Sequence, residues 1–111
     1  MLDQTAPTPR GSSIPDRLLN EAVRELSDRN YEDAILKLNQ AAEFYEQMNN
    51  TLGLAMTHYN LGVATLSQGN EDGAFSRFVD AVQLFTESNW PAGISLAERG
   101  ADVASSIREV E

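Results

Sequence analysis

Hydrophobic residues recur three or four positions apart along most of the chain, which is the spacing of one face of an α-helix. Within residues 31–48 this spacing places on one stripe Ala34, Ile35, Leu38, Ala41, Ala42 and Tyr45. The same spacing returns further on at Ala74, Phe75, Phe78, Ala81, Val82 and Phe85. No segment alternates between apolar and polar residues as a half-buried strand would. The pattern therefore predicts an all-α protein.

Clusters of Ser, Asn and Gly interrupt this periodicity and mark turns. They divide the chain into five expected helices, at residues 16–28, 31–48, 52–68, 71–88 and 91–109. Pro15 and Pro91 lie where the first and last helices begin, a position that tolerates proline. Gly69 is expected to end the third helix with a positive φ. Residues 1–13 are rich in Thr, Ser, Pro and Gly, which predicts a flexible tail ahead of a helical domain at 14–111.

The chain also resembles itself at a shift of 40 residues. Identical residues fall on each other at Asn20/Asn60, Val23/Val63, Leu26/Leu66, Asn30/Asn70, Ala34/Ala74, Ala41/Ala81, Asn49/Asn89 and Gly53/Gly93. A helix-turn-helix unit repeated in this way buries its apolar face by stacking on its neighbour. We therefore expect two helical hairpins, at about 16–49 and 55–89, followed by a C-terminal capping helix at about 91–109.

The second of these units contains residues that resemble the pattern of a known family. Tyr59-Asn60-Leu61-Gly62, then Ala64, Gln68-Gly69, Ala74, Phe78 and Ala81 resemble a tetratricopeptide repeat (TPR). The 40-residue period exceeds the usual length of about 34 and is similar to the longer repeats of kinesin light chains and Pins-type adaptors. His58 and Thr65 depart from the family pattern, which has Trp and Tyr there. The resemblance implies an α-α superhelix with a concave groove that binds a protein segment, and it implies no catalytic residues.

The residues that the resemblance places in the groove come from the first helix of each unit. They are Leu19, Asn20 and Val23, then Met56, Tyr59, Asn60 and Val63, then Leu96, Arg99 and Val103, with Asp16 and Gly100 at the remaining positions. The resemblance implies that Asn20 and Asn60 hydrogen-bond the backbone of an extended ligand. The apolar residues among them form a strip. We expect this strip to take no part in packing between the helices, and an exposed apolar patch usually marks a contact surface. Arg99 is the one basic candidate, so an apolar or amphipathic peptide or helix is the expected partner.

Composition narrows the function classes. Eight Lys and Arg against 17 Asp and Glu give a net charge of −9, which disfavours nucleic acid and anionic membrane as partners. The chain has no cysteine and one histidine, so no thiolate or multi-histidine metal site and no cysteine nucleophile are available. We expect no cofactor and no enzymatic activity. His58 is expected to have a packing role, and Trp90 is equally consistent with an interaction anchor and with a cap between helices.

These observations predict a non-enzymatic interaction module, an adaptor or scaffold. The alternative is a chaperone or assembly factor that shields an apolar client segment. Self-association through the groove or the last helix is a further open alternative. Without an apolar run long enough to cross a bilayer or a signal-peptide pattern, a cytoplasmic location is expected.

Overall fold

The computed structural model describes residues 7–110, and this part of the chain contains five α-helices. They are α1 (Ile14–Ser27), α2 (Tyr31–Gln47), α3 (Thr51–Ser67), α4 (Glu71–Glu87) and α5 (Pro91–Val110). All five expected helices are confirmed, and every boundary lies within two residues of the expected one. The parts of the predicted tail and domain that fall on residues 1–6 and 111 lie outside the described residues.

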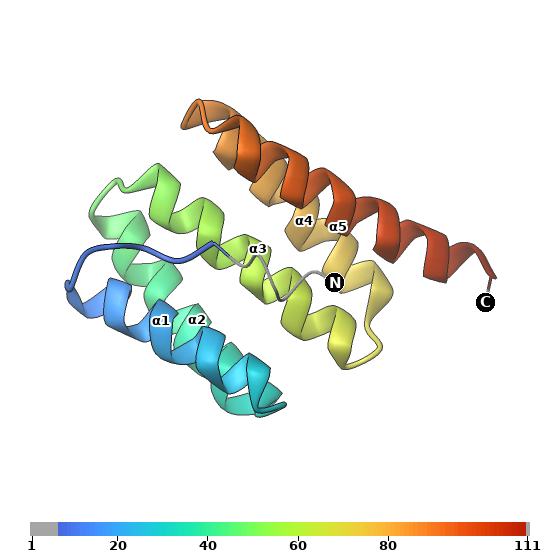
Figure 1. Cartoon of the computed structure of the whole chain (residues 1–111), viewed down its shortest axis with the longest axis horizontal. Coiled ribbons are helices and arrows are strands. Elements are labelled where there is room, and N and C mark those ends of the chain that lie inside the picture. Colours follow the sequence, from blue (N-terminus) through green and yellow to red (C-terminus); the bar gives the residue numbers. More distant parts are fainter. Residues whose placement is uncertain (1–6, 111) are drawn as a thin grey trace.

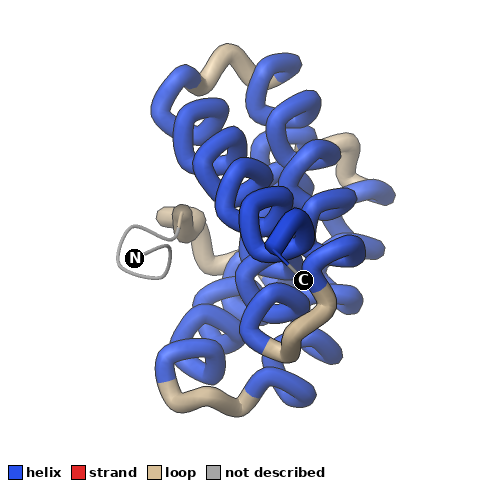
Figure 2. Tube along the Cα trace, turned by 90° about the vertical axis from the view of Figure 1, so that its right-hand side faces the viewer, coloured by secondary structure: helices blue, strands red, loops and turns tan. Residues whose placement is uncertain are grey.

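Each helix packs against the next one along the chain, so the fold is an all-helical, repeat-like stack. α1, α3 and α5 lie side by side, with α2 and α4 behind them (Figures 1 and 2). α3 is the central helix because it contacts α1, α2, α4 and α5. We call the surface formed by α1, α3 and α5 the odd-helix face.

The four turns between helices share one backbone design. Each contains a single residue with positive φ: Arg29 (63°), Asn49 (55°), Gly69 (84°) and Asn89 (53°). The residue after it donates its N–H to a carbonyl five residues earlier, which satisfies an orphan carbonyl at the helix end. The positive φ expected at Gly69 is confirmed. Arg29 pairs with Gly69, and Asn49 with Asn89, at the 40-residue period, so the repeat extends to the turns.

Close contacts between aromatic rings and glycines set the spacing of the helices. Phe78 of α4 is fully buried between α3 and α5, where its ring lies against Gly62 and Gly100. Tyr45 lies in the same way against Gly53, and Phe85 against Gly93, which are again pairs 40 residues apart. A side chain at any of these glycines would meet a ring, so the absence of a Cβ permits the close approach.

Within residues 7–110, two ion pairs connect neighbouring helices, one half-buried and one exposed. Lys37 of α2 binds Glu25 of α1, and the Glu25 carboxylate is the main reason that the pKa of Lys37 is raised. Arg108 of α5 binds Asp72 of α4 at 3.1 Å and lies over the Phe75 ring, 5.0 Å from its centroid. Arg108 and Asp72 are exposed, and an exposed ion pair contributes little to stability.

Candidate functional site

The predicted groove residues differ widely in their exposure. Leu19, Tyr59 and Asn60 have no exposed surface, and Met56 and Val63 are also buried. Asn20, Val23 and Leu96 are half-buried, whereas Arg99 and Val103 are exposed. The structure therefore brings the predicted residues on α3 together at the centre of the fold. The predicted residues on α5 lie nearer the surface.

Helix packing does need four of these apolar side chains, contrary to our expectation. They belong to the continuous hydrophobic core and are Leu19, Met56, Tyr59 and Val63. The Tyr59 ring packs against Phe78 of α4, with ring centroids 5.6 Å apart. The prediction that the apolar strip is free of helix packing is therefore wrong for these four residues, because Leu19 is buried on α1 and the other three lie on α3, which contacts all four other helices.

Residues 7–13 run along the odd-helix face to the start of α1 (Figure 1). They contain no helical turn, yet Pro7 is buried. The Asn60 side chain donates through Nδ2 to the carbonyl of Pro7 at 3.3 Å, across 53 residues of sequence. An asparagine predicted to bind the backbone of an extended ligand thus binds a backbone carbonyl of its own chain.

A second hydrogen bond fixes the orientation of the Asn60 amide. Nδ2 also donates to the Met56 carbonyl at 2.8 Å. Two carbonyl oxygens therefore face the nitrogen, and the opposite orientation of the amide would set oxygen against oxygen. The other atom of the amide, Oδ1, is buried and accepts no hydrogen bond. An unpaired buried acceptor costs about 1–3 kcal/mol, so Asn60 is an unusual residue in this core.

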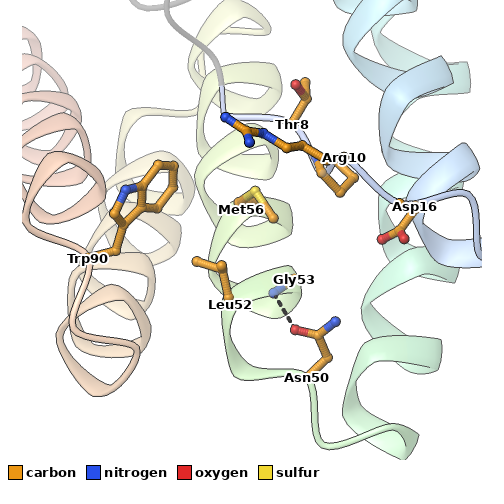
Figure 3. A pocket seen from close by; sticks show the side chains of 10 residues that line it. Thr8, Arg10, Asp16, Asn50, Leu52, Gly53, Met56 and Trp90 are labelled. Carbon is orange, nitrogen blue, oxygen red and sulfur yellow. Dashed lines mark hydrogen bonds between the residues drawn. The ribbon is translucent and has the colours of Figure 1, made fainter.

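A pocket of about 470 Å³ opens on the odd-helix face beside this segment. Its lining consists of Thr8, Pro9, Arg10, Gly11, Asp16, Asn50, Leu52, Gly53, Met56 and Trp90. Figure 3 shows Leu52 and Met56 on α3, Trp90 on one side, Asp16 on the other, and Thr8 and Arg10 above. The pocket therefore has an apolar base with charged groups at its margin, an arrangement typical of ligand sites.

Hydrogen bonds hold two polar residues of the pocket wall in place. The Tyr45 hydroxyl donates to the Asp16 carboxylate. Burial, and secondly this bond to Asp16, raise the pKa of Tyr45, so the phenol stays neutral and remains a donor. Asn50 accepts from the Gly53 N–H at 2.9 Å and so caps α3 (Figure 3). These contacts give the pocket a fixed wall from α1 to α3.

Trp90 has the packing role considered from the sequence. Its ring packs edge-on against Phe85, with centroids 5.3 Å apart, at the junction of α4 and α5. The residue is half-buried and also lines the pocket. Its role as an interaction anchor stays a prediction.

Sequence reasoning overlooked most of the pocket. Met56 and Asp16 were expected on this face, whereas Leu52, Asn50 and residues 8–11 were not assigned to it. The one available signal was the Pro-Thr-Pro run at 7–9, because proline-rich segments adopt extended conformations that other proteins bind as ligands. A tail of this composition was a candidate occupant of its own domain.

Comparison of the chain with protein-family models, with curated proteins and with solved structures finds no match. Among residues 7–110, no three His, Asp or Glu side chains gather as metal ligands would. None of the helices in this range is long and apolar enough to span a membrane.

His58 lies on α3, half-buried, with its Nδ1 buried and without a hydrogen-bond partner. Burial is the main cause that lowers its pKa, and the Arg77 guanidinium acts in the same direction. The Asp80 and Glu46 carboxylates act in the opposite direction but do not outweigh burial. The folded chain thus favours neutral His58, whereas the unfolded chain binds a proton more readily.

This difference predicts a pH dependence of stability. Well above about pH 6.5, the usual pKa of histidine, His58 is neutral in both states, and as the pH falls through this value the unfolded state binds a proton before the folded state does. The free energy of unfolding should therefore fall between about pH 7.5 and pH 5.5 because of His58. Urea unfolding of the native chain and of His58→Gln at both pH values isolates this contribution. An identical pH dependence in the two proteins would contradict the assignment.

Proposed function

We propose that this chain is a non-enzymatic interaction module that binds an extended or amphipathic peptide segment of a partner on its odd-helix face, as TPR-like adaptors do. The observation that carries the proposal is the hydrogen bond from Asn60 to the Pro7 carbonyl. It is the kind of contact with an extended backbone that the resemblance implied. The repeated turns and ring–glycine contacts support a stacked-repeat architecture of TPR type.

The pocket beside Asn60 supports the same function and indicates what a partner would present. Leu52 is 39% exposed although it is a leucine, and it lies next to Met56 and the half-buried Trp90. Exposed apolar side chains that converge on a hollow favour contact with an apolar side chain of a ligand. Arg10 and Asp16 at the margin provide polar contacts that would orient it.

Selection from a displayed library of short random peptides tests this proposal. Peptides that bind the native chain should lose roughly tenfold or more in affinity for Leu52→Glu, because a carboxylate would be desolvated in an apolar pocket. Val79→Glu is the matched control, since Val79 of α4 is 44% exposed and is not part of the pocket lining. Circular dichroism checks that both variants keep their helices. A selection without binders, or binders that tolerate Leu52→Glu, would reject the proposal.

A further inference from the structure

The segment already on the odd-helix face satisfies only part of the Asn60 side chain. The Nδ2 of Asn60 reaches the Pro7 carbonyl, while Oδ1 is buried without a hydrogen bond. Asn60 as a whole has no exposed surface, so water does not reach that oxygen. The unpaired atom is an acceptor, and its natural complement is an N–H donor.

The chemistry of proline explains why the donor is missing. In an extended segment the N–H and C=O of one residue point to the same side, which lets opposed residues of antiparallel strands exchange two hydrogen bonds. A side-chain amide presents a donor and an acceptor side by side and can take the place of the opposed residue. Pro7 offers its carbonyl to such an amide, but proline has no backbone N–H. Any other residue at this position would offer both groups.

The segment also leaves room beside itself. Thr8, Pro9 and Arg10 form one wall of the pocket, and Leu52, Met56 and Trp90 form the apolar remainder. The pocket of about 470 Å³ is therefore space that the segment borders but does not fill. Its contact with Asn60 is also long, at 3.3 Å, compared with 2.8 Å for the bond from Asn60 to Met56.

From these observations we infer that residues 7–9 are a built-in, displaceable occupant of the odd-helix face, and that the partner which replaces them is an extended peptide with a free backbone N–H where the chain itself has Pro7. The inference rests on the proposed function and adds to it a rule for the ligand. The chain's own segment has a proline opposite Asn60. The partner peptide has a residue other than proline there, next to an apolar residue. The missing hydrogen bond keeps the internal occupant weak enough to leave.

Two peptides of the chain's own sequence provide the probe. One has the sequence of residues 4–13, and the other is identical except for Pro7→Ala. Each is titrated at up to millimolar concentration into the full chain, and the backbone amide resonances of Gly53 and Met56 and the indole N–H resonance of Trp90, which all line the pocket, are followed by NMR. Because the internal segment competes equally with both, their ratio of affinities reports the added N–H. The Pro7→Ala peptide should bind roughly three- to tenfold more tightly, as one further hydrogen bond predicts.

Two chain variants test whether this preference arises at Asn60. In Asn60→Ala the ratio should fall to about one, whereas in Asn20→Ala it should be unchanged. Asn20 is the matched control because it occupies the same repeat position on α1 and is half-buried. Circular dichroism confirms that each variant is folded. A third variant, Pro7→Ala in the chain itself, should resist displacement by either peptide more strongly than the native chain does.

Equal affinity of the two peptides for the native chain would overturn the inference, as would a preference that survives Asn60→Ala. Absence of any displacement at millimolar peptide would overturn it too, since the internal segment would then be a fixed part of the fold. The Leu52→Glu experiment separates the two levels of the argument. If library peptides still depend on Leu52 while the two probes bind equally, the ligand rule fails and the interaction module stands.

Discussion

Replacing Phe78 by alanine should cost about 3–5 kcal/mol of the free energy of unfolding, the largest effect expected from one truncation in this chain. Phe78 is fully buried, and its ring lies against Gly62 of α3 and Gly100 of α5. It also packs against Tyr59 at 5.6 Å between centroids. Removing the ring therefore leaves a cavity where three helices meet, and glycines have no side chain with which to fill it.

Phe44→Ala is the control for this prediction, because Phe44 is 37% exposed on α2. Its truncation should cost much less, since little cavity forms at a surface position. Urea unfolding followed by circular dichroism measures both variants against the native chain. A domain of this size is stable by about 5–15 kcal/mol, so Phe78→Ala should be marginally folded at 25 °C. Similar losses for Phe44→Ala and Phe78→Ala would show that the stack is not held by this ring.

The helices could be predicted from the sequence because the information that specifies them is local. Apolar residues at three- and four-residue spacing define a helix wherever they occur, and Asn and Gly define where it stops. Pro91 begins α5, and Gly69 has a positive φ in the turn that ends α3, as expected. The 40-residue repeat extended this local information to the order of packing, because each hairpin must cover its neighbour.

The exposure of individual groove residues could not be predicted in the same way. Helical periodicity shows in which direction a side chain points, but it does not show what covers it. The Tyr59 ring packs against Phe78 of α4, and Leu19 lies in the core. α3 has apolar residues on several sides, which is typical of a central helix. The side of α3 on the odd-helix face and its sides toward the other helices therefore cannot be separated from sequence alone.

The occupant of the odd-helix face was missed for a different physical reason. Composition correctly indicated that residues 7–13 form no helix, and it predicted a flexible tail. The contact that positions Pro7 is made with Asn60, 53 residues away. No local pattern encodes a bond of that separation. The Asn60 prediction and the proline-rich composition were both available, but their connection required the three-dimensional arrangement.

The ring–glycine contact at Phe78 predicts a second large effect, with the opposite change in volume. Gly62→Ala would raise the helix propensity of α3 by about 1 kcal/mol, and at an exposed position it would stabilise the protein. Here the new Cβ would lie 2.7 Å from the Phe78 ring, closer than real Cβ atoms come to a neighbour. The ring cannot retreat, because Gly100 lies against it as well. We therefore expect a net loss of about 1–3 kcal/mol despite the gain in propensity.

A double-mutant cycle with Phe78→Leu separates steric conflict from any general effect of the substitution. Leucine is smaller than phenylalanine, so in that background the Cβ introduced at Gly62 finds space. The cost of Gly62→Ala should then shrink or change sign, which gives a coupling free energy of about 1–3 kcal/mol in urea unfolding. Costs that add independently would mean that Gly62 is not required for the approach of α3 to α4. A strong coupling would establish that the spacing of these helices, and with it the width of the odd-helix face, depends on one ring between two glycines.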